Sequence, residues 1–88
     1  MTYTVVLLKE KDGRYSVVVP ALSGCATFGE SLPEALHMAE EAILAYLEGL
    51  QALGEAIPPD VDSVNVSLDE AVEASIYKLM VEEAEVVA

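Results

Sequence analysis

The stretch from residue 15 to residue 53 constrains the fold most, because it contains two strands and a helix whose limits are all marked. Residues 15–19, Tyr-Ser-Val-Val-Val, are rich in β-branched side chains, and Pro20 ends this strand because it has no N–H for a ladder. After a short turn, residues 25–28 return as the next strand, which Gly29 ends. The turn is so short that the two strands must pair antiparallel.

A capped helix follows these strands directly. Ser31 and Glu34 have the spacing of a capping box, in which each side chain accepts a hydrogen bond from the other residue's amide. Pro33 suits the first turn of a helix, and Gly54 is placed just after the last turn. The apolar side chains between them recur at helical spacing and form one stripe: Leu32, Ala35, Leu36, Ala39, Ala42, Ile43, Tyr46, Leu47, Leu50 and Leu53. The pattern predicts a helix over residues 32–53 that covers one face of a sheet.

The first strand is predicted over residues 3–8, Tyr-Thr-Val-Val-Leu-Leu, and an Asp12-Gly13 turn joins it to the strand at 15–19. Residues 5–8 are all apolar, so hydrophobic side chains fall on both faces of this strand. That pattern is typical of a strand that is covered on both sides. The first three strands therefore form an antiparallel meander.

Two further elements are predicted after the helix. Residues 61–66 alternate as a strand does, and the helical connection before them favours a crossover and a parallel neighbour. Beyond them, the side chains at mostly helical spacing predict a short amphipathic helix: Leu68, Val72, Ile76, Leu79, Met80 and Glu83. We expect one α+β domain over residues 1–67, of β-β-β-α-β order, and a C-terminal helix and tail over residues 68–88.

The charge of the chain limits its partners. Its 88 residues include 16 acidic and 4 basic side chains, for a formal net charge of −12. Such a surface repels phosphate backbones, so direct binding of nucleic acid is not expected, whereas a basic protein is the favoured partner. Residues 1–4 lack the features of a signal peptide, and the uncharged apolar runs are too short to span a bilayer. We expect a cytoplasmic protein.

The candidates for catalysis are weak. Glu34, Glu41 and Glu48 fall on the solvent face of the predicted helix, where no apolar wall would raise a carboxyl pKa. His37 is the only histidine and lies among these glutamates, while Cys25 lies at the start of a strand without a base to form its thiolate. We therefore expect no catalytic residue, no metal site and no cofactor.

Two apolar residues fall outside the stripe of the predicted helix. Met38 and Leu44 lie about 120° to either side of its centre, at 100° per residue. A two-faced first strand and an apolar tail add further uncovered surface. Met38 and Leu44 are therefore the candidate contacts with another chain.

The organising stretch resembles the HicB-like antitoxin family. The residues that carry the resemblance are Tyr15, Val17, Pro20, Leu22, Gly24, Cys25, Thr27, Gly29, Glu30, Ser31, Glu34, Ala35 and Leu36, followed by Ala39-Glu40-Glu41-Ala42 and Gly54-Glu55-x-Ile57-Pro58. They span roughly residues 3 to 67 with the intervening segments. The resemblance implies a partial ribonuclease H-like β-β-β-α-β domain, whose fourth strand is parallel to the first.

The resemblance also implies a function. Antitoxins of this family bind and neutralise HicA, a small basic RNA-cleaving toxin, and commonly form dimers or tetramers. Many carry a C-terminal DNA-binding segment, but residues 68–83 supply one acidic helix and a single basic residue, Lys78, so operator binding is not expected. The first alternative is a stand-alone oligomeric protein of the same fold, with no toxin and no DNA target. A small acid/base or metal enzyme is the weaker alternative.

Overall fold

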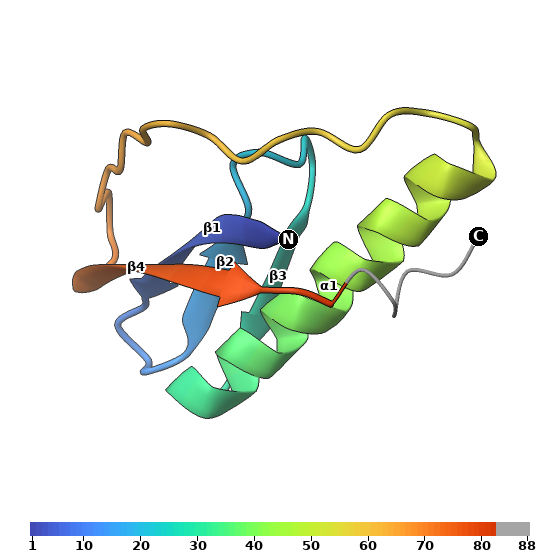
Figure 1. The fold of residues 1–88 in the computed structure, drawn as a ribbon. Coiled ribbons are helices and arrows are strands. Elements are labelled where there is room, and N and C mark those ends of the chain that lie inside the picture. The colour runs from blue at the N-terminus through green and yellow to red at the C-terminus, as the bar shows by residue number, and fades with distance from the viewer. Residues whose placement is uncertain (83–88) are drawn as a thin grey trace.

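The computed structural model describes residues 1–82 as a four-stranded sheet with one helix against it (Figure 1). The sheet has the order β3-β2-β1-β4, and every neighbouring pair is antiparallel. The elements, in chain order, are β1 (Thr2–Lys9), β2 (Tyr15–Val18), β3 (Ala26–Gly29), α1 (Leu32–Ala52) and β4 (Glu73–Met80). The small α+β domain and the meander of the first three strands are confirmed.

The core lies between α1 and one face of the sheet. Alternate residues of β1 and β2 point toward the helix, among them Leu7 and Val17, which are paired across the two strands. From the helix side, the buried residues follow the predicted stripe at every fourth position: Ala35, Ala39, Ile43 and Leu47. The small side chains near the start of α1 allow β3 to lie close, and the larger ones fill the core farther along the helix.

The start of α1 lies at the predicted position, but only one of the two hydrogen bonds of the predicted capping box is formed, without the one from the Ser31 amide to the Glu34 carboxylate. Ser31 is the N-cap residue, and its hydroxyl accepts a hydrogen bond from the Glu34 amide at 3.3 Å. Pro33 lies in the first turn. At the other end, Gly54 has a φ of 72°, which suits a residue without a side chain, just after the cap at Leu53.

Ser31→Ala is expected to lower the free energy of unfolding by about 1 kcal/mol, because the Glu34 amide loses its acceptor. Denaturant titration of both proteins measures this difference. An unchanged midpoint with an unchanged slope would show that the hydroxyl does not stabilise the helix.

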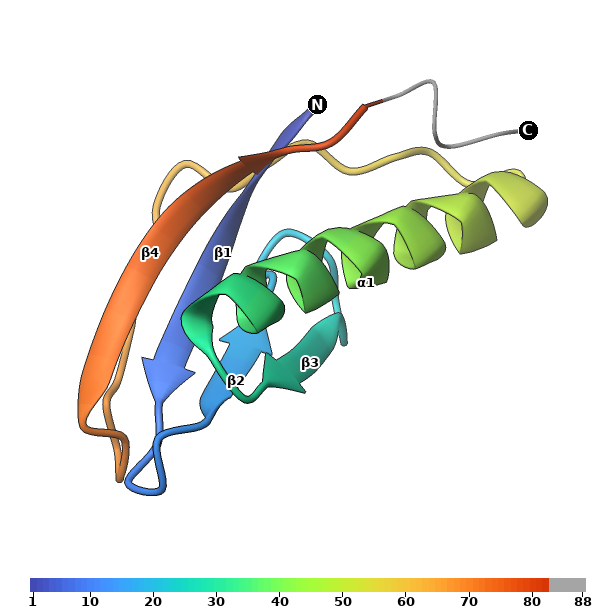
Figure 2. The same cartoon turned by 90° about the horizontal axis from the view of Figure 1, so that it is seen from below.

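The prediction of a strand at residues 61–66 is wrong. These residues have no ladder partner and belong to a long connection, 53–72, which crosses the face of the sheet opposite α1 (Figure 2). Val61 and Val64 are half-buried there. The alternating sequence therefore does not correspond to a strand, and Val66 is exposed.

The prediction of a C-terminal helix is also wrong over the described residues, because residues 73–80 form β4. This strand pairs with β1 along eight positions, from Thr2 opposite Met80 to Lys9 opposite Glu73. Tyr77 and Leu79 pack on the core, while Ile76 and Met80 point to the other face. The side chains at helical spacing include residues from both faces of this strand. Glu83, the last residue of the predicted helix, lies outside the described residues.

The neighbour of β1 also differs from the expectation. The resemblance implied a parallel fourth strand beside β1, but the strand that occupies this place is antiparallel and comes from farther along the chain. The internal position that the resemblance implied for β1 is correct, because β1 lies between β2 and β4.

Candidate interaction surfaces

The carboxylate of Asp60 links the 53–72 connection to the sheet through hydrogen bonds. Asp60 accepts hydrogen bonds from the Thr4 amide (2.9 Å), the Thr4 hydroxyl (2.8 Å) and Lys78 Nζ (3.1 Å). Lys78 Nζ also donates to the Thr4 hydroxyl at 2.6 Å, so the three residues form a closed network across β1 and β4. We call these three residues the Asp60 network.

The Asp60 network favours the ionised carboxylate. Partial burial by itself would raise the pKa of Asp60, but the hydrogen bonds from Thr4 and Lys78 outweigh it, and the pKa lies below its ordinary value of 3.8. No pattern in the sequence predicted this group. Lys78 was a possible signal, since a lone cation in an acidic segment is often paired.

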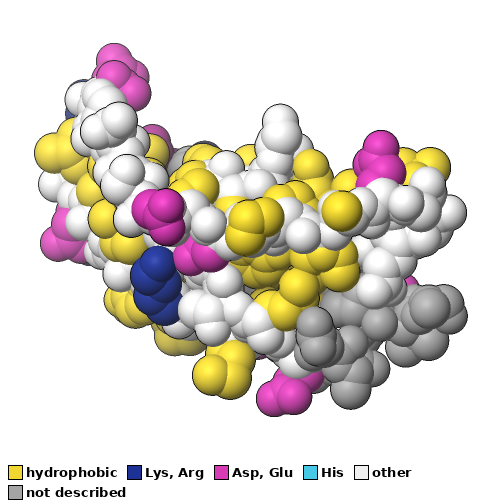
Figure 3. Space-filling model, turned by 45° about the horizontal axis from the view of Figure 1, so that its top comes forward, with side chains coloured by type: hydrophobic (Ala, Val, Ile, Leu, Met, Phe, Trp, Pro, Cys, Tyr) yellow, Lys and Arg dark blue, Asp and Glu magenta, His cyan; other side chains and the backbone are white. Residues whose placement is uncertain are grey.

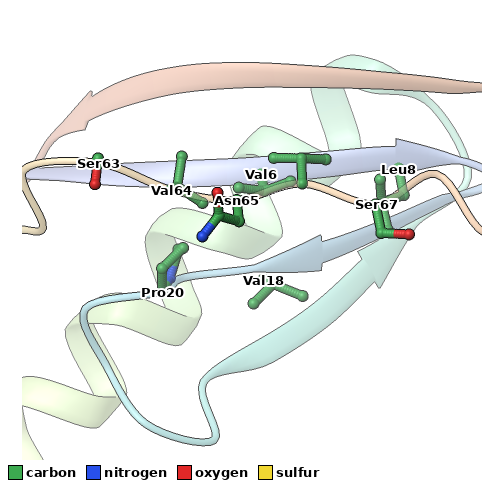
Figure 4. Close-up of a pocket in the computed structure, with 9 residues that line it drawn as sticks. Val6, Leu8, Val18, Pro20, Ser63, Val64, Asn65 and Ser67 are labelled. Carbon is green, nitrogen blue, oxygen red and sulfur yellow. The ribbon is translucent and has the colours of Figure 1, made fainter.

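A hollow of about 400 Å³ lies between the connection and the sheet (Figure 4). Its floor is apolar and comes from β1 and from the end of β2, and its rim is the connection; the lining residues are Val6, Leu8, Val18, Pro20 and Ser63–Ser67. None of these side chains carries a charge. The apolar floor can accept an apolar side chain, and the polar groups of the lining are the uncharged side chains of Ser63, Asn65 and Ser67.

The same side of the molecule exposes several large hydrophobic side chains. Phe28 on β3 is 63% exposed, and Ile76 and Met80 on β4 are 53% and 72% exposed. Hydrophobic side chains gather over this side among scattered charged groups (Figure 3). The sheet face opposite α1 is therefore only partly covered by the connection.

The outer face of α1 has a different character. Glu34, Glu40, Glu41 and Glu48 are all exposed on the helix. His37 lies among them, with its Nε2 3.6 Å from Glu41 Oε1, a weak pair on the surface. This acidic face of α1 suits a basic partner.

The two predicted contact residues lie on either side of that acidic face. Met38 and Leu44 are half-buried, and Leu44 packs partly against the core. They are six positions apart and so project about 120° from each other. The structure does not bring them together into one patch.

The one cysteine is not placed as a nucleophile. Cys25 is buried in the core cluster, and burial raises the pKa of its thiol. A buried thiol is protonated at neutral pH and reacts slowly. His37 is on the exposed helix face, and among residues 1–82 no group of three His, Cys, Asp or Glu side chains could hold a metal ion.

Within residues 1–82, no helix is both long enough and apolar enough to cross a membrane.

Comparison with known proteins agrees with the fold. A UPF0150 protein of Thermoplasma acidophilum is 52% identical over 60 residues, which are 68% of this chain and 87% of that protein. The N-terminal domain of the Burkholderia pseudomallei antitoxin HicB has a TM-score of 0.69 at 25% identity, over 93% of this chain and 99% of that one. A chain of a toxin–antitoxin complex from Streptococcus pneumoniae has a TM-score of 0.71 at 23% identity, over 100% of this chain and 73% of that one.

The family comparison covers nearly the whole sequence. The model of the HicB-like antitoxin of bacterial toxin–antitoxin systems matches residues 3–84, which include the helix and all of the strands except the first residue of β1. The chain belongs to the HicB-like antitoxin family.

Proposed function

We propose that this protein is the antitoxin of a toxin–antitoxin pair and neutralises a small basic RNA-cleaving toxin by binding and covering it. The observation that carries the proposal is the acidic face of α1 on a chain with a net charge of −12. Membership of the HicB-like antitoxin family and the similarity to a chain of a toxin–antitoxin complex support it. In this function the protein is not an enzyme and needs no cofactor.

The toxin would dock on the acidic face of α1. Glu41 and Glu48 supply charge near the middle of this face, and charge of one sign steers an oppositely charged partner and speeds its association. Met38 and Leu44 flank the acids and supply apolar contact that persists when salt screens the charges. Binding in this way would cover the toxin without any chemical step.

The test is co-expression with the basic protein that the adjacent reading frame encodes. We expect this chain to restore growth and to co-purify with that protein. Association should slow as salt rises, because charges in solution are screened beyond about 10 Å at 0.1 M, while dissociation should change less. A toxic neighbour that this chain fails to restrain would favour the stand-alone protein instead.

A pair of charge-reversal variants locates the docking surface. Glu41→Lys with Glu48→Lys should slow association by about tenfold or more, since it reverses charge where the toxin docks. Asp62→Lys with Glu70→Lys changes the net charge equally, but both residues lie on the connection. Equal slowing by both pairs would mean that overall charge, and not the acidic face of α1, steers the toxin.

We also propose that the protein associates with itself and does not bind operator DNA alone. Sedimentation at micromolar concentrations should report at least a dimer. Duplex DNA from its own promoter should not bind, because the acids of a −12 chain repel the phosphates. Tight operator binding without a partner would contradict this part of the proposal.

A further inference from the structure

The strand β4 forms a long, open edge of the sheet. It is the outermost strand beside β1, and within residues 1–82 no segment pairs with its outer side (Figure 2). It spans eight residues in unbroken register, whereas β3, at the other edge, spans four. Long open edges pair readily with a further strand.

The hydrogen bonds at the end of β4 show which backbone groups point outward. Met1 and Val81 exchange bonds, with Val81 N donating to Met1 O and Met1 N donating to Val81 O. In an antiparallel ladder such exchanging pairs occur at every second residue. The residues between them, namely Ala74, Ile76, Lys78 and Met80, therefore direct their N–H and C=O groups to the open edge.

This edge lacks the features that usually prevent pairing. It has no proline, and its two charged residues, Glu73 and Lys78, have opposite signs. Lys78 is already held by the Asp60 network. In a chain with a net charge of −12, β4 is thus a neutral segment along which two copies can approach without strong repulsion.

We propose that β4 binds β4 of a second copy in antiparallel orientation, around a two-fold axis through Ile76. The two-fold axis that relates two antiparallel edge strands runs perpendicular to the sheet. Two residues that lie opposite each other across this axis therefore have their side chains on the same face of the sheet. Ile76 can therefore lie opposite Ala74, Ile76 or Lys78 of the second copy. Only the register with Ile76 opposite Ile76 places these two exposed side chains together.

The same register pairs the other exposed side chains of that face. Met80 lies opposite Val72 of the second copy, and both are more than half exposed in the single chain. Lys78 lies opposite Ala74, whose small side chain leaves the Asp60 network undisturbed. The product is a continuous sheet with both α1 helices on one side and their acidic faces free.

This proposal rests on the self-association proposed above and goes beyond it by naming the interface, the orientation and the register through which two copies join. Its test is the mass of the purified protein in solution, measured by light scattering across micromolar concentrations. We expect twice the chain mass of 9.4 kDa or a multiple of it. A wild-type protein that stays monomeric at every concentration would overturn the proposal.

Variants on the two sheet edges then locate the interface. Ile76→Lys should shift the mass toward the monomer, because it places two ammonium groups opposite each other. Ile76→Pro should also shift the mass toward the monomer, because proline has no N–H to donate across the open edge. The N–H of Ile76 points away from β1, so this substitution removes no hydrogen bond to β1. Phe28→Lys, an equally exposed position on β3, should leave the mass unchanged. Loss of association in Phe28→Lys, or its persistence in both folded Ile76 variants, would overturn the proposal.

A cross-linking experiment checks the register directly. Ile76→Cys should be joined to a second copy by a short bis-maleimide reagent, because facing Cβ atoms in a sheet lie about 5 Å apart. Phe28→Cys and the wild-type chain, whose Cys25 is buried, should not be joined. Failure of Ile76→Cys to cross-link in an associated protein would exclude this register. Binding of the toxin is scored separately by co-purification, so failure of either proposal is distinguishable from failure of the other.

Discussion

Gly29→Ala is expected to lower the free energy of unfolding by about 3 kcal/mol, at the upper end of the usual cost of overpacking. A Cβ built at Gly29 lies 2.5 Å from the Ala35 backbone N and 2.6 Å from its Cα. Those atoms belong to the first turns of α1 and cannot rotate away, so β3 and α1 must move apart. The melting temperature should fall by about 15 °C in a domain of this size.

Gly49→Ala is the matched control for that substitution. It introduces the same methyl group in α1, but no atom lies within 4 Å of the new Cβ. Since glycine is a poor helix former, this variant should be more stable than the wild type by about 1 kcal/mol. Thermal unfolding of both variants measures the two effects, and a Gly29→Ala protein as stable as the wild type would mean that β3 is not held against α1.

Asp60→Asn is expected to lower the free energy of unfolding by about 2 kcal/mol at neutral pH, a typical value for hydrogen bonds to a charged group. The new amide nitrogen would replace one carboxylate oxygen and turn its hydrogens toward Lys78 and the Thr4 hydroxyl, which both donate to that oxygen. The Thr4 side chain is 3% exposed and has little access to water as a substitute.

The effect of Asp60→Asn should depend on pH. Because the pKa of Asp60 is lowered in the folded protein, its stabilising contribution is complete above the ordinary value of 3.8 and is lost as the pH falls below it. The difference between variant and wild type should therefore shrink as the pH falls below 3.8. Asp62→Asn, on an exposed neighbour, should show no comparable difference. If the difference in the free energy of unfolding between variant and wild type stays constant with pH, the charge of Asp60 is not its source.

Local signals in the sequence predicted most of the domain correctly. The capping serine, Ser31, and the glycine after the helix, Gly54, set the limits of α1 within a residue or two, because both act through neighbouring backbone groups. The Asp12-Gly13 turn and the turn after Pro20 predicted the antiparallel meander correctly, because these short turns also act locally, between strands that are neighbours in the sequence. The two-faced pattern of β1 agrees with the internal position that the resemblance implied, although it could not show which strand lies beside it.

The last strand could not be predicted in this way, because its conformation depends on β1, about 70 residues earlier in the chain. In β4, apolar side chains on both faces produce a spacing that also fits a helix. Residues 61–66 show the opposite ambiguity, since their sequence alternates as a strand does although the segment has no ladder partner and only Val61 and Val64 are half-buried. Periodicity alone does not show what covers a side chain.

The interaction surfaces were predicted only in part. The acidic face of α1 follows from helical spacing, and so do the flanking positions of Met38 and Leu44. The Asp60 network and the open edge of β4 were missed, because each depends on the place of β4 in the sheet. A single lysine among acids was the only trace of the network in the sequence.

The pairing of β1 with β4 also determines when the protein can fold. During synthesis β1 leaves the ribosome first, but its partner on one side follows about 70 residues later. Until then β1 presents an unpaired edge between the nascent meander and solvent, and such late, non-local pairing slows folding. The sheet can therefore close only after β4 has been synthesised, because β1 has no strand on that side before then.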